Sequence, residues 1–83
     1  MPIDHYGDVP VYQQLAAILR EQIASGKLAP RRPIPSKRAL TQEYEIAGGT
    51  VDRAVDLLKG EGLVRTVPGR GIYVVPPDER SKT

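Results

Sequence analysis

The hydrophobic spacing of this chain changes once along its length, and that change restricts the folds open to it. Between residues 10 and 58, apolar side chains recur mainly at steps of three and four residues, the spacing that lines one face of a helix. Residues 63–67 and 72–75 are instead β-prone runs on either side of Pro68-Gly69, a pair that fits the middle of a type II turn. The sequence therefore predicts an α+β fold that is mostly α, with helices followed by one two-stranded hairpin.

Proline and glycine divide the helical part into three segments. Pro10 fits the first helical turn, where its missing N–H is not needed, and Gly26 can take the left-handed conformation that ends a helix. The prolines at 30–35 prevent a new helix before Ser36, whose hydroxyl is a good N-cap, so this stretch is expected to be extended, with a short strand at Ile34. The predicted helices cover 10–25, 36–45 and a third segment that follows the connection 46–49 and ends near Gly60, and they turn Ala39, Leu40, Tyr44, Val51, Ala54, Val55 and Leu58 inward.

The composition excludes most catalytic and metal-dependent functions. The chain has no cysteine, so a thiolate metal site is excluded, and its single histidine, His5, cannot make a metal cluster or a catalytic dyad by itself. We expect no enzyme activity, no cofactor and no metal. No stretch approaches the ~20 apolar residues of a membrane span, and the N-terminus lacks a secretory signal, so a cytoplasmic location without a membrane partner is expected.

The 83 residues fit one domain with a short extension at each end. Residues 1–9 precede the first helical pattern and form the expected N-terminal extension, and residues 10–75 form the domain. Pro76-Pro77 halts the second strand, and no apolar residue follows, so 76–83 is expected to be a disordered tail or a linker.

Basic residues are concentrated in one short window. The net charge of +2 is too small to indicate a nucleic-acid partner, but Arg31, Arg32, Lys37 and Arg38 place four of the twelve basic residues within eight positions that hold no acid. Such a cluster can bind phosphate groups, and it can equally be a solvated loop.

Several short motifs follow one another in a specific order across nearly the whole chain. They are Pro10 to Leu15, Ser25 to Pro30, Pro35 to Leu40, Thr50 to Val55, Glu61 to Val64 and Gly69 to Tyr73. Their order and spacing resemble the DNA-binding domain of the GntR family of bacterial transcription regulators. The resemblance implies a winged helix-turn-helix, three helices followed by a hairpin wing, that binds double-stranded DNA as a transcriptional repressor. It also implies a (pseudo)palindromic operator, a homodimer, and an effector ligand that is bound outside this segment.

The third helix is the candidate for the major groove, because a groove about 12 Å wide admits one helix whose first residues meet base edges. The resemblance implies that the start of the second helix also lies close to DNA and that the wing tip lies in or beside the minor groove, where negative potential attracts arginine. Flexible cations nearby are expected to face phosphates. The predicted DNA-binding residues are Arg31, Arg32, Ser36, Lys37, Arg38, Gly48, Gly49, Thr50, Asp52, Arg53, Gly69, Arg70 and Gly71.

Some of these residues have purely structural explanations, and two depart from the family pattern. Ser36 is fully explained as an N-cap, and the alternative for Arg70 is a solvated turn residue. Where the family commonly carries arginines, this chain has Gly48 and Asp52, and Ala47 removes the N-cap hydroxyl of the third helix. Asp can accept a hydrogen bond from cytosine N4, so a rewritten specificity is one alternative. The other is a degenerate winged helix used for protein–protein interaction.

Overall fold

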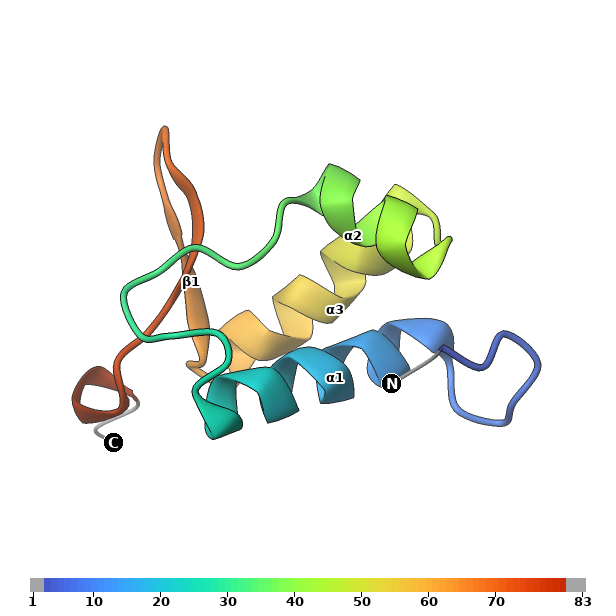
Figure 1. The fold of residues 1–83 in the computed structure, drawn as a ribbon, viewed down its shortest axis with the longest axis horizontal. Helices are drawn as coiled ribbons and strands as arrows, with labels where there is room; N and C mark the ends of the chain where they lie inside the picture. Colours follow the sequence, from blue (N-terminus) through green and yellow to red (C-terminus); the bar gives the residue numbers. More distant parts are fainter. Residues whose placement is uncertain (1–2, 81–83) are drawn as a thin grey trace.

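The computed structural model describes residues 3–80, and its elements follow the predicted order. They are α1 (Val11–Ser25), α2 (Lys37–Tyr44), α3 (Gly48–Gly60), β1 (Val64–Val67), β2 (Gly71–Val74) and the 3-10 turn η1 (Pro77–Glu79). In Figure 1, α3 crosses above α1, α2 lies near the start of α3, and the hairpin of β1 and β2 projects away from the helices. The predicted fold of three helices followed by a wing is confirmed.

The core forms where α1 packs against α3. Leu15 and Leu19 of α1 are 0% exposed. The predicted inward residues of α3 are all buried: Val51, Ala54, Val55 and Leu58. The exposed residues of α3, among them Asp52, Asp56 and Lys59, lie between these buried positions and face solvent.

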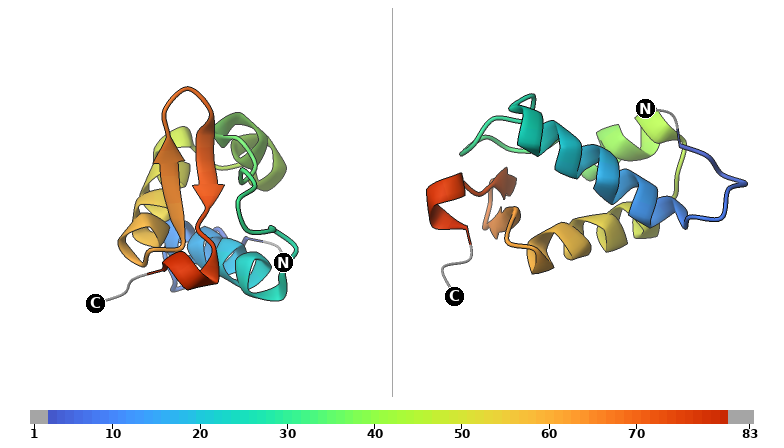
Figure 2. Two further views of the ribbon diagram at one scale, coloured as in Figure 1. Left: turned by 90° about the vertical axis from the view of Figure 1, so that its left-hand side faces the viewer. Right: turned by 90° about the horizontal axis from the view of Figure 1, so that it is seen from below.

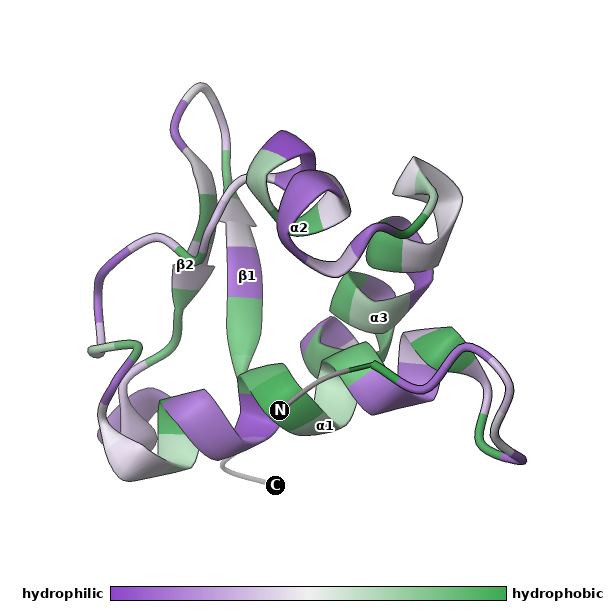
Figure 3. Cartoon of the chain, turned by 45° about the vertical axis from the view of Figure 1, so that its right-hand side comes forward, coloured by the Kyte–Doolittle hydropathy of each residue, from purple (hydrophilic) through white to green (hydrophobic). Residues whose placement is uncertain are grey.

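The short helix α2 buries less than predicted. Leu40 is buried and Tyr44 is half-buried, but Ala39 is exposed, so its predicted inward position is wrong. Adjacent residues of a helix point about 100° apart. A helix that packs through Leu40 and Tyr44, four residues apart, therefore turns Ala39 to solvent. Figure 3 shows α2 coloured mostly hydrophilic, as expected for a helix with one buried residue.

The helix ends follow the serine and glycine signals closely. Gly26 caps α1 with a φ of 85°, and the Ser36 hydroxyl accepts a hydrogen bond from the Ala39 N–H at 3.1 Å, so both predictions are confirmed. Pro10 is the N-cap of α1 rather than a residue of its first turn, a difference of one position. Its φ of −54° is close to the value that the proline ring imposes, and the missing N–H is not needed at either position.

The connection between α2 and α3 is shorter than predicted. Glu45 ends α2 in the left-handed conformation, with a φ of 55°, and its N–H donates to the Thr41 carbonyl. This conformation turns the chain sharply, so α3 begins at Gly48 instead of after the predicted connection 46–49. The two glycines of that segment thus belong to the first turn of α3.

The wing is an antiparallel hairpin with the predicted turn. Gly69 has a φ of 76°, and the Arg70 N–H donates to the Val67 carbonyl at 2.9 Å, as a type II turn with Pro68 and Gly69 at its centre requires. The register pairs Val64 with Val74, Arg65 with Tyr73, Thr66 with Ile72 and Val67 with Gly71. The strand bounds differ from those predicted by one residue.

Residues 31–34 run beside β2 and extend the sheet. The Val74 N–H donates to the Arg32 carbonyl and the Ile34 N–H donates to the Ile72 carbonyl, both at 2.9 Å. The bridge is centred on Pro33, one residue before the predicted strand, and stays short because Pro33 has no N–H to donate. This segment thereby holds the wing next to the start of α2.

Both ends of the described chain fold against the domain. Gln14 of α1 holds the N-terminal loop: its Nε2 donates to the carbonyls of Asp4 and Val9 at 2.8 and 2.7 Å. At the other end, Pro76 is buried, η1 follows, and Glu79 pairs with Arg31 at 2.8 Å. Figure 2 shows η1 beneath the hairpin.

Residues 76–80 are held by the buried Pro76, the Arg31–Glu79 pair and a hydrogen bond from Arg80 Nε to the Val75 carbonyl. Arg31 lies 48 residues from Glu79 in the sequence, so local composition does not reveal that pair. The expectation that 76–83 is a disordered tail or a linker stays a prediction. Residues 81–83 lie outside the described residues, and the division into 1–9, 10–75 and 76–83 stays a prediction.

A salt bridge ties the end of α3 to α1. Arg20 donates through Nε and Nη2 to the two carboxylate oxygens of Glu61, at 2.8 and 2.6 Å. These hydrogen bonds lower the pKa of the Glu61 carboxyl below its ordinary value and raise that of Arg20. The pair fixes the corner where α3 gives way to β1.

We expect Glu61→Gln to lower the free energy of unfolding at neutral pH by up to about 1 kcal/mol, the range of partly exposed ion pairs. Because the folded protein lowers the pKa of Glu61, this stabilisation is fully present above the ordinary value of 4.5 and is lost as the pH falls through the folded value. Urea titrations of parent and variant at neutral pH and in acid measure the difference.

The control for this experiment is Glu21→Gln, which changes an exposed glutamate of α1 that makes no ion pair within residues 3–80. An equal loss in both variants, or a loss for Glu61→Gln that persists in acid, contradicts the assigned role of the salt bridge.

Candidate nucleic-acid interface

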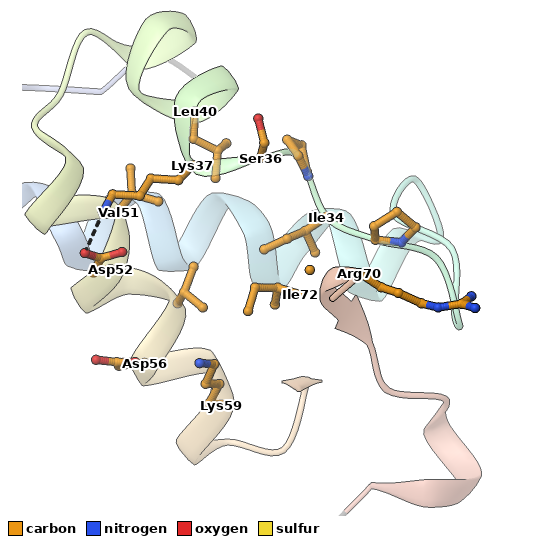
Figure 4. Close-up of a pocket in the computed structure, with 14 residues that line it drawn as sticks. Ile34, Ser36, Lys37, Leu40, Val51, Asp52, Asp56, Lys59, Arg70 and Ile72 are labelled. Atoms are coloured by element: carbon orange, nitrogen blue, oxygen red, sulfur yellow. Dashed lines mark hydrogen bonds and ion pairs between the residues drawn. The ribbon is translucent and has the colours of Figure 1, made fainter. Parts of the chain in front are cut away.

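An open groove of about 660 Å³ lies between α3 and the wing. Its floor is apolar and formed by Ile34, Leu40, Val51, Val55 and Ile72. Its charged lining residues are Lys37, Asp52, Asp56, Lys59 and Arg70 (Figure 4). The view shows Lys37 reaching from α2 toward Asp52, while the Arg70 side chain extends away from the other charged groups.

The N-terminus of α3 has no side-chain cap. Ala47 occupies the N-cap position in an extended conformation, and its carbonyl accepts from the N–H groups of Thr50 and Val51. The N–H groups of Gly48 and Gly49 have no backbone partner in the part of the chain that the structure describes. These two donors, at the positive end of a helix dipole, suit an anionic group such as a phosphate.

Lys37 and Asp52 form an ion pair across the helix-turn-helix. Nζ of Lys37 lies 2.9 Å from Oδ2 of Asp52, and the two side chains are 56% and 58% exposed. The Lys37 side chain passes over Gly48 so closely that a Cβ at that position would lie 2.7 Å from Cε of Lys37. The sequence predicts Lys37 as a phosphate-facing cation, whereas in the folded chain an acid already holds its ammonium.

Two further predicted cations are engaged away from the groove. The guanidinium of Arg53 lies 4.7 Å from the centre of the Tyr12 ring on α1, within the range of a cation–π interaction. Arg31 pairs with Glu79 in η1. Both arginines therefore have intramolecular partners that would compete with a phosphate.

The structure brings some of the predicted site residues together and leaves others apart. Ser36, Lys37, Asp52, Arg70 and Gly71 line the groove, and Gly48 lies against Lys37. The predicted residues outside the groove lining are Arg31, Arg32, Arg38, Gly49, Thr50, Arg53 and Gly69. Among these, Arg32 and Arg38 are exposed on the segment leading into α2 and on α2 itself. Their DNA contacts stay predictions.

Sequence reasoning missed two charged residues of the groove and one aromatic partner. Asp56 and Lys59 lie on the same side of α3 as Asp52, and the steps of four and three residues between them were an available signal. Tyr12 stacks on Arg53 from a position 41 residues away, for which the sequence holds no local signal.

The described residues contain neither a cluster of metal ligands nor a membrane-spanning helix. Residues 3–80 contain no group of three or more His, Cys, Asp or Glu side chains arranged to hold a metal ion. None of the helices in this range is long and apolar enough to cross a membrane.

Comparison with protein families and curated proteins identifies relatives over most of the chain. The family described as "Bacterial regulatory proteins, gntR family" matches residues 11–74. The HTH-type transcriptional repressor NagR of Bacillus subtilis is 36% identical over 77 residues, which is 93% of this chain and 32% of NagR. The repressor MngR of the mannosyl-D-glycerate system of Escherichia coli is 37% identical over 68 residues, 82% of this chain and 28% of MngR. The chain thus spans about a third of the length of these two relatives.

Two solved structures share the fold over most of the chain. YtrA from Sulfolobus acidocaldarius, a GntR-family transcription factor, has a TM-score of 0.81 and 34% identity, covering 89% of this chain and 78% of that one. The AraR DNA-binding domain in complex with operator ORR3 has a TM-score of 0.79 and 28% identity, covering 90% of each chain. NagR and MngR are named as repressors and YtrA as a transcription factor, none of them as an enzyme, in agreement with the expectation from composition.

We expect Ala47→Ser to stabilise the protein by about 1 kcal/mol, because the hydroxyl would accept from a free N–H at the start of α3. Ala47 has a φ of −72° and a ψ of 152°, close to the −65° and 159° of Ser36, which already caps α2 in this way. Thermal or urea unfolding measures the change. Ala47→Val is the control, since it adds bulk without an acceptor, and equal stability of the serine and valine variants would contradict the capping argument.

Proposed function

The chain belongs to the GntR family of bacterial regulatory proteins, and on that basis we propose that it is the DNA-binding domain of a transcriptional repressor. The observation that carries this proposal is the likeness to the operator-bound AraR domain, which extends over 90% of both chains. The two curated relatives are named as repressors, which supports repression as the direction of regulation.

In this proposal the N-terminal half of α3 enters the major groove. The side of α3 that faces α1 is buried, so Gly48, Gly49 and Asp52 are on the part of the helix that a base edge can reach. Glycine at position 49, where a Cβ would have no neighbour within 4 Å, lets the backbone come close to DNA, and the free N–H groups of Gly48 and Gly49 bind a phosphate.

The wing contributes the second contact, in or beside the minor groove. Arg70 is an exposed residue at the hairpin tip, and its side chain extends away from the groove charges in Figure 4. A narrow minor groove concentrates negative potential and attracts arginine without reading base identity. Arg32 and Arg38 add contacts to the phosphate backbone, which increase affinity and carry no sequence information.

The partner is double-stranded DNA with a (pseudo)palindromic operator, bound by a homodimer. A helix-turn-helix dimer places its two recognition helices about one turn of DNA apart, so the symmetry of the operator follows that of the protein. Dimerisation and effector binding are assigned to other parts of the regulator, since the chain matches only about a third of the length of its curated relatives. Binding to chromosomal DNA places the protein in the bacterial cytoplasm.

The second candidate is a protein-interaction module. Asp52 and Asp56 put two acids on the solvent side of α3, and Lys37, Arg31 and Arg53 have partners within the chain. A surface with this balance of charge suits a basic or mixed protein partner better than phosphate. The dependence of binding on salt distinguishes the two candidates.

We expect the chain to bind duplex DNA with a non-specific Kd of about 10⁻⁴–10⁻⁶ M at physiological salt, and log K to fall linearly with log salt because phosphate contacts release counterions. Fluorescence anisotropy with a labelled random duplex at four salt concentrations measures the slope. Absence of binding at low salt would exclude the DNA-binding proposal and leave the protein-interaction module.

We expect Arg70→Ala to weaken DNA binding and reduce the salt slope by about 1, the value for one phosphate contact, while stability stays within about 0.5 kcal/mol of the parent. The matched control is Lys27→Ala, which removes an equal charge from an exposed position outside the groove lining. Anisotropy titrations and thermal melts are made on the same samples. Equal losses of affinity in both variants would show that only net charge matters, and that the wing tip has no specific contact.

A further inference from the structure

The ion pair between Lys37 and Asp52 is not explained by stability. Lys37 is the first residue of α2, and its side chain lies over Gly48, the first residue of α3. Both places are positive ends of helix dipoles, where a cation is unfavourable. An ion pair with both side chains more than half exposed adds little to compensate. The arrangement therefore calls for another explanation.

The ion pair depends on a third residue, Gly48, as well as on Lys37 and Asp52. Gly48 leaves the space through which the lysine side chain passes, because a Cβ there would lie 2.7 Å from Cε of Lys37. Asp52, one turn further along α3, holds the ammonium at the end of that path, at 2.9 Å. The two departures from the family pattern, Gly48 and Asp52, are thus parts of one local structure that carries the α2 lysine over the start of α3.

Both groups keep hydrogen-bonding capacity for a ligand. An ammonium has three donors and a carboxylate about four acceptor positions, and the ion pair uses one of each. Exposure of 56% and 58% leaves the remaining donors and acceptors open to solvent. The pair thus presents a donor and an acceptor side by side at the beginning of the candidate recognition helix.

We propose that Lys37 and Asp52 act as one specificity-determining unit that reads a G·C base pair in the major groove. This inference rests on the proposed function, because it needs the start of α3 to meet base edges. The lysine donates to guanine and the aspartate accepts from the N4 amino group of the paired cytosine, both of which are established types of base contact.

The spacing of the two groups matches that edge. O6 of guanine and N4 of cytosine are joined by an N–H···O hydrogen bond, so they lie about 2.9–3.0 Å apart. Nζ of Lys37 and Oδ2 of Asp52 are 2.9 Å apart. When the ion pair lies along the edge of the base pair, the ammonium of Lys37 faces O6 of guanine and the carboxylate of Asp52 faces N4 of cytosine. Both contacts form without breaking the ion pair.

An A·T pair fits the same unit less well. The carboxylate would reach adenine N6 beside the N7 acceptor, which repels it, and the ammonium would reach thymine O4 beside the C5-methyl group. At a G·C pair the ammonium has both O6 and N7 of guanine within reach, and the carboxylate meets no second acceptor. The unit therefore favours G·C in one orientation.

The test is selection of bound sequences from random duplexes by the full chain and its variants. The parent should enrich G·C at one position by about 5- to 100-fold over the other base pairs, the discrimination of one good contact. Asp52→Ala should lose most of that discrimination. The double variant Lys37→Asp with Asp52→Lys exchanges donor and acceptor without changing composition, so it should select C·G at the same position.

Two controls separate base reading from charge and from folding. Asp56→Ala removes the next acid of α3, which makes no ion pair within the described range, and should alter overall affinity but retain the G·C preference. Gly48→Ala adds only a Cβ where Cε of Lys37 lies and should weaken the preference at unchanged net charge. If thermal melts show that the double variant is unfolded, Asp52→Leu, which keeps a side chain of similar size but has no acceptor, replaces it and should lose the preference.

The outcomes distinguish a failure of this inference from a failure of the proposed function. If the parent binds no duplex at low salt, DNA binding itself fails. If the parent binds with a steep salt slope but shows no G·C preference, or if Asp52→Ala or the double variant selects the parent's sequence, DNA binding stands and the reading of a G·C pair by Lys37 and Asp52 is overturned.

Discussion

The packing of α1 against α3 is the constraint on which the rest of this small domain depends. Two alanines in the shared core, Ala16 and Ala54, are fully buried, and such small side chains let helices approach closely. With these residues buried, the exposed residues of α3, among them Asp52, Asp56 and Lys59, are the ones that can meet a partner. The Arg20–Glu61 salt bridge then fixes the corner between α3 and β1, from which the wing starts. The positions of both candidate DNA contacts, α3 and the wing, therefore depend on the packing of α3 against α1.

Intramolecular partners determine which of the basic residues are available to DNA. Lys37, Arg31 and Arg53 are held by Asp52, Glu79 and Tyr12. Arg32, Arg38 and Arg70 make no ion pair within residues 3–80 and are exposed. The positive surface is therefore smaller than the basic window of the sequence indicates. In the proposed function, affinity therefore comes from a few phosphate contacts, and in the further inference the neutral Lys37–Asp52 pair has a role in base recognition instead of in charge neutralisation.

Features encoded by neighbouring residues were predictable, and features that join distant residues were not. The Ser36 cap, the Gly26 helix end and the turn at Pro68-Gly69 each depend on a few consecutive residues, and each was predicted correctly. The exposed Ala39 and the left-handed Glu45 were not, because each depends on how α2 is set against the rest of the domain. The same difference between local and distant features holds for the candidate site. Its positions on α3 and the wing followed from the sequence, but the pairing across it did not.

The sequence by itself determined the order of the three helices and the hairpin and the family to which the chain belongs, since periodicity, prolines and glycines act locally. Only the tertiary structure decided which charges meet. Lys37 and Asp52 are 15 residues apart, and Arg31 and Glu79 are 48 apart. An ion pair needs its atoms within a few ångströms of each other, and that distance exists only where α2 packs on α3 and η1 lies beside Arg31.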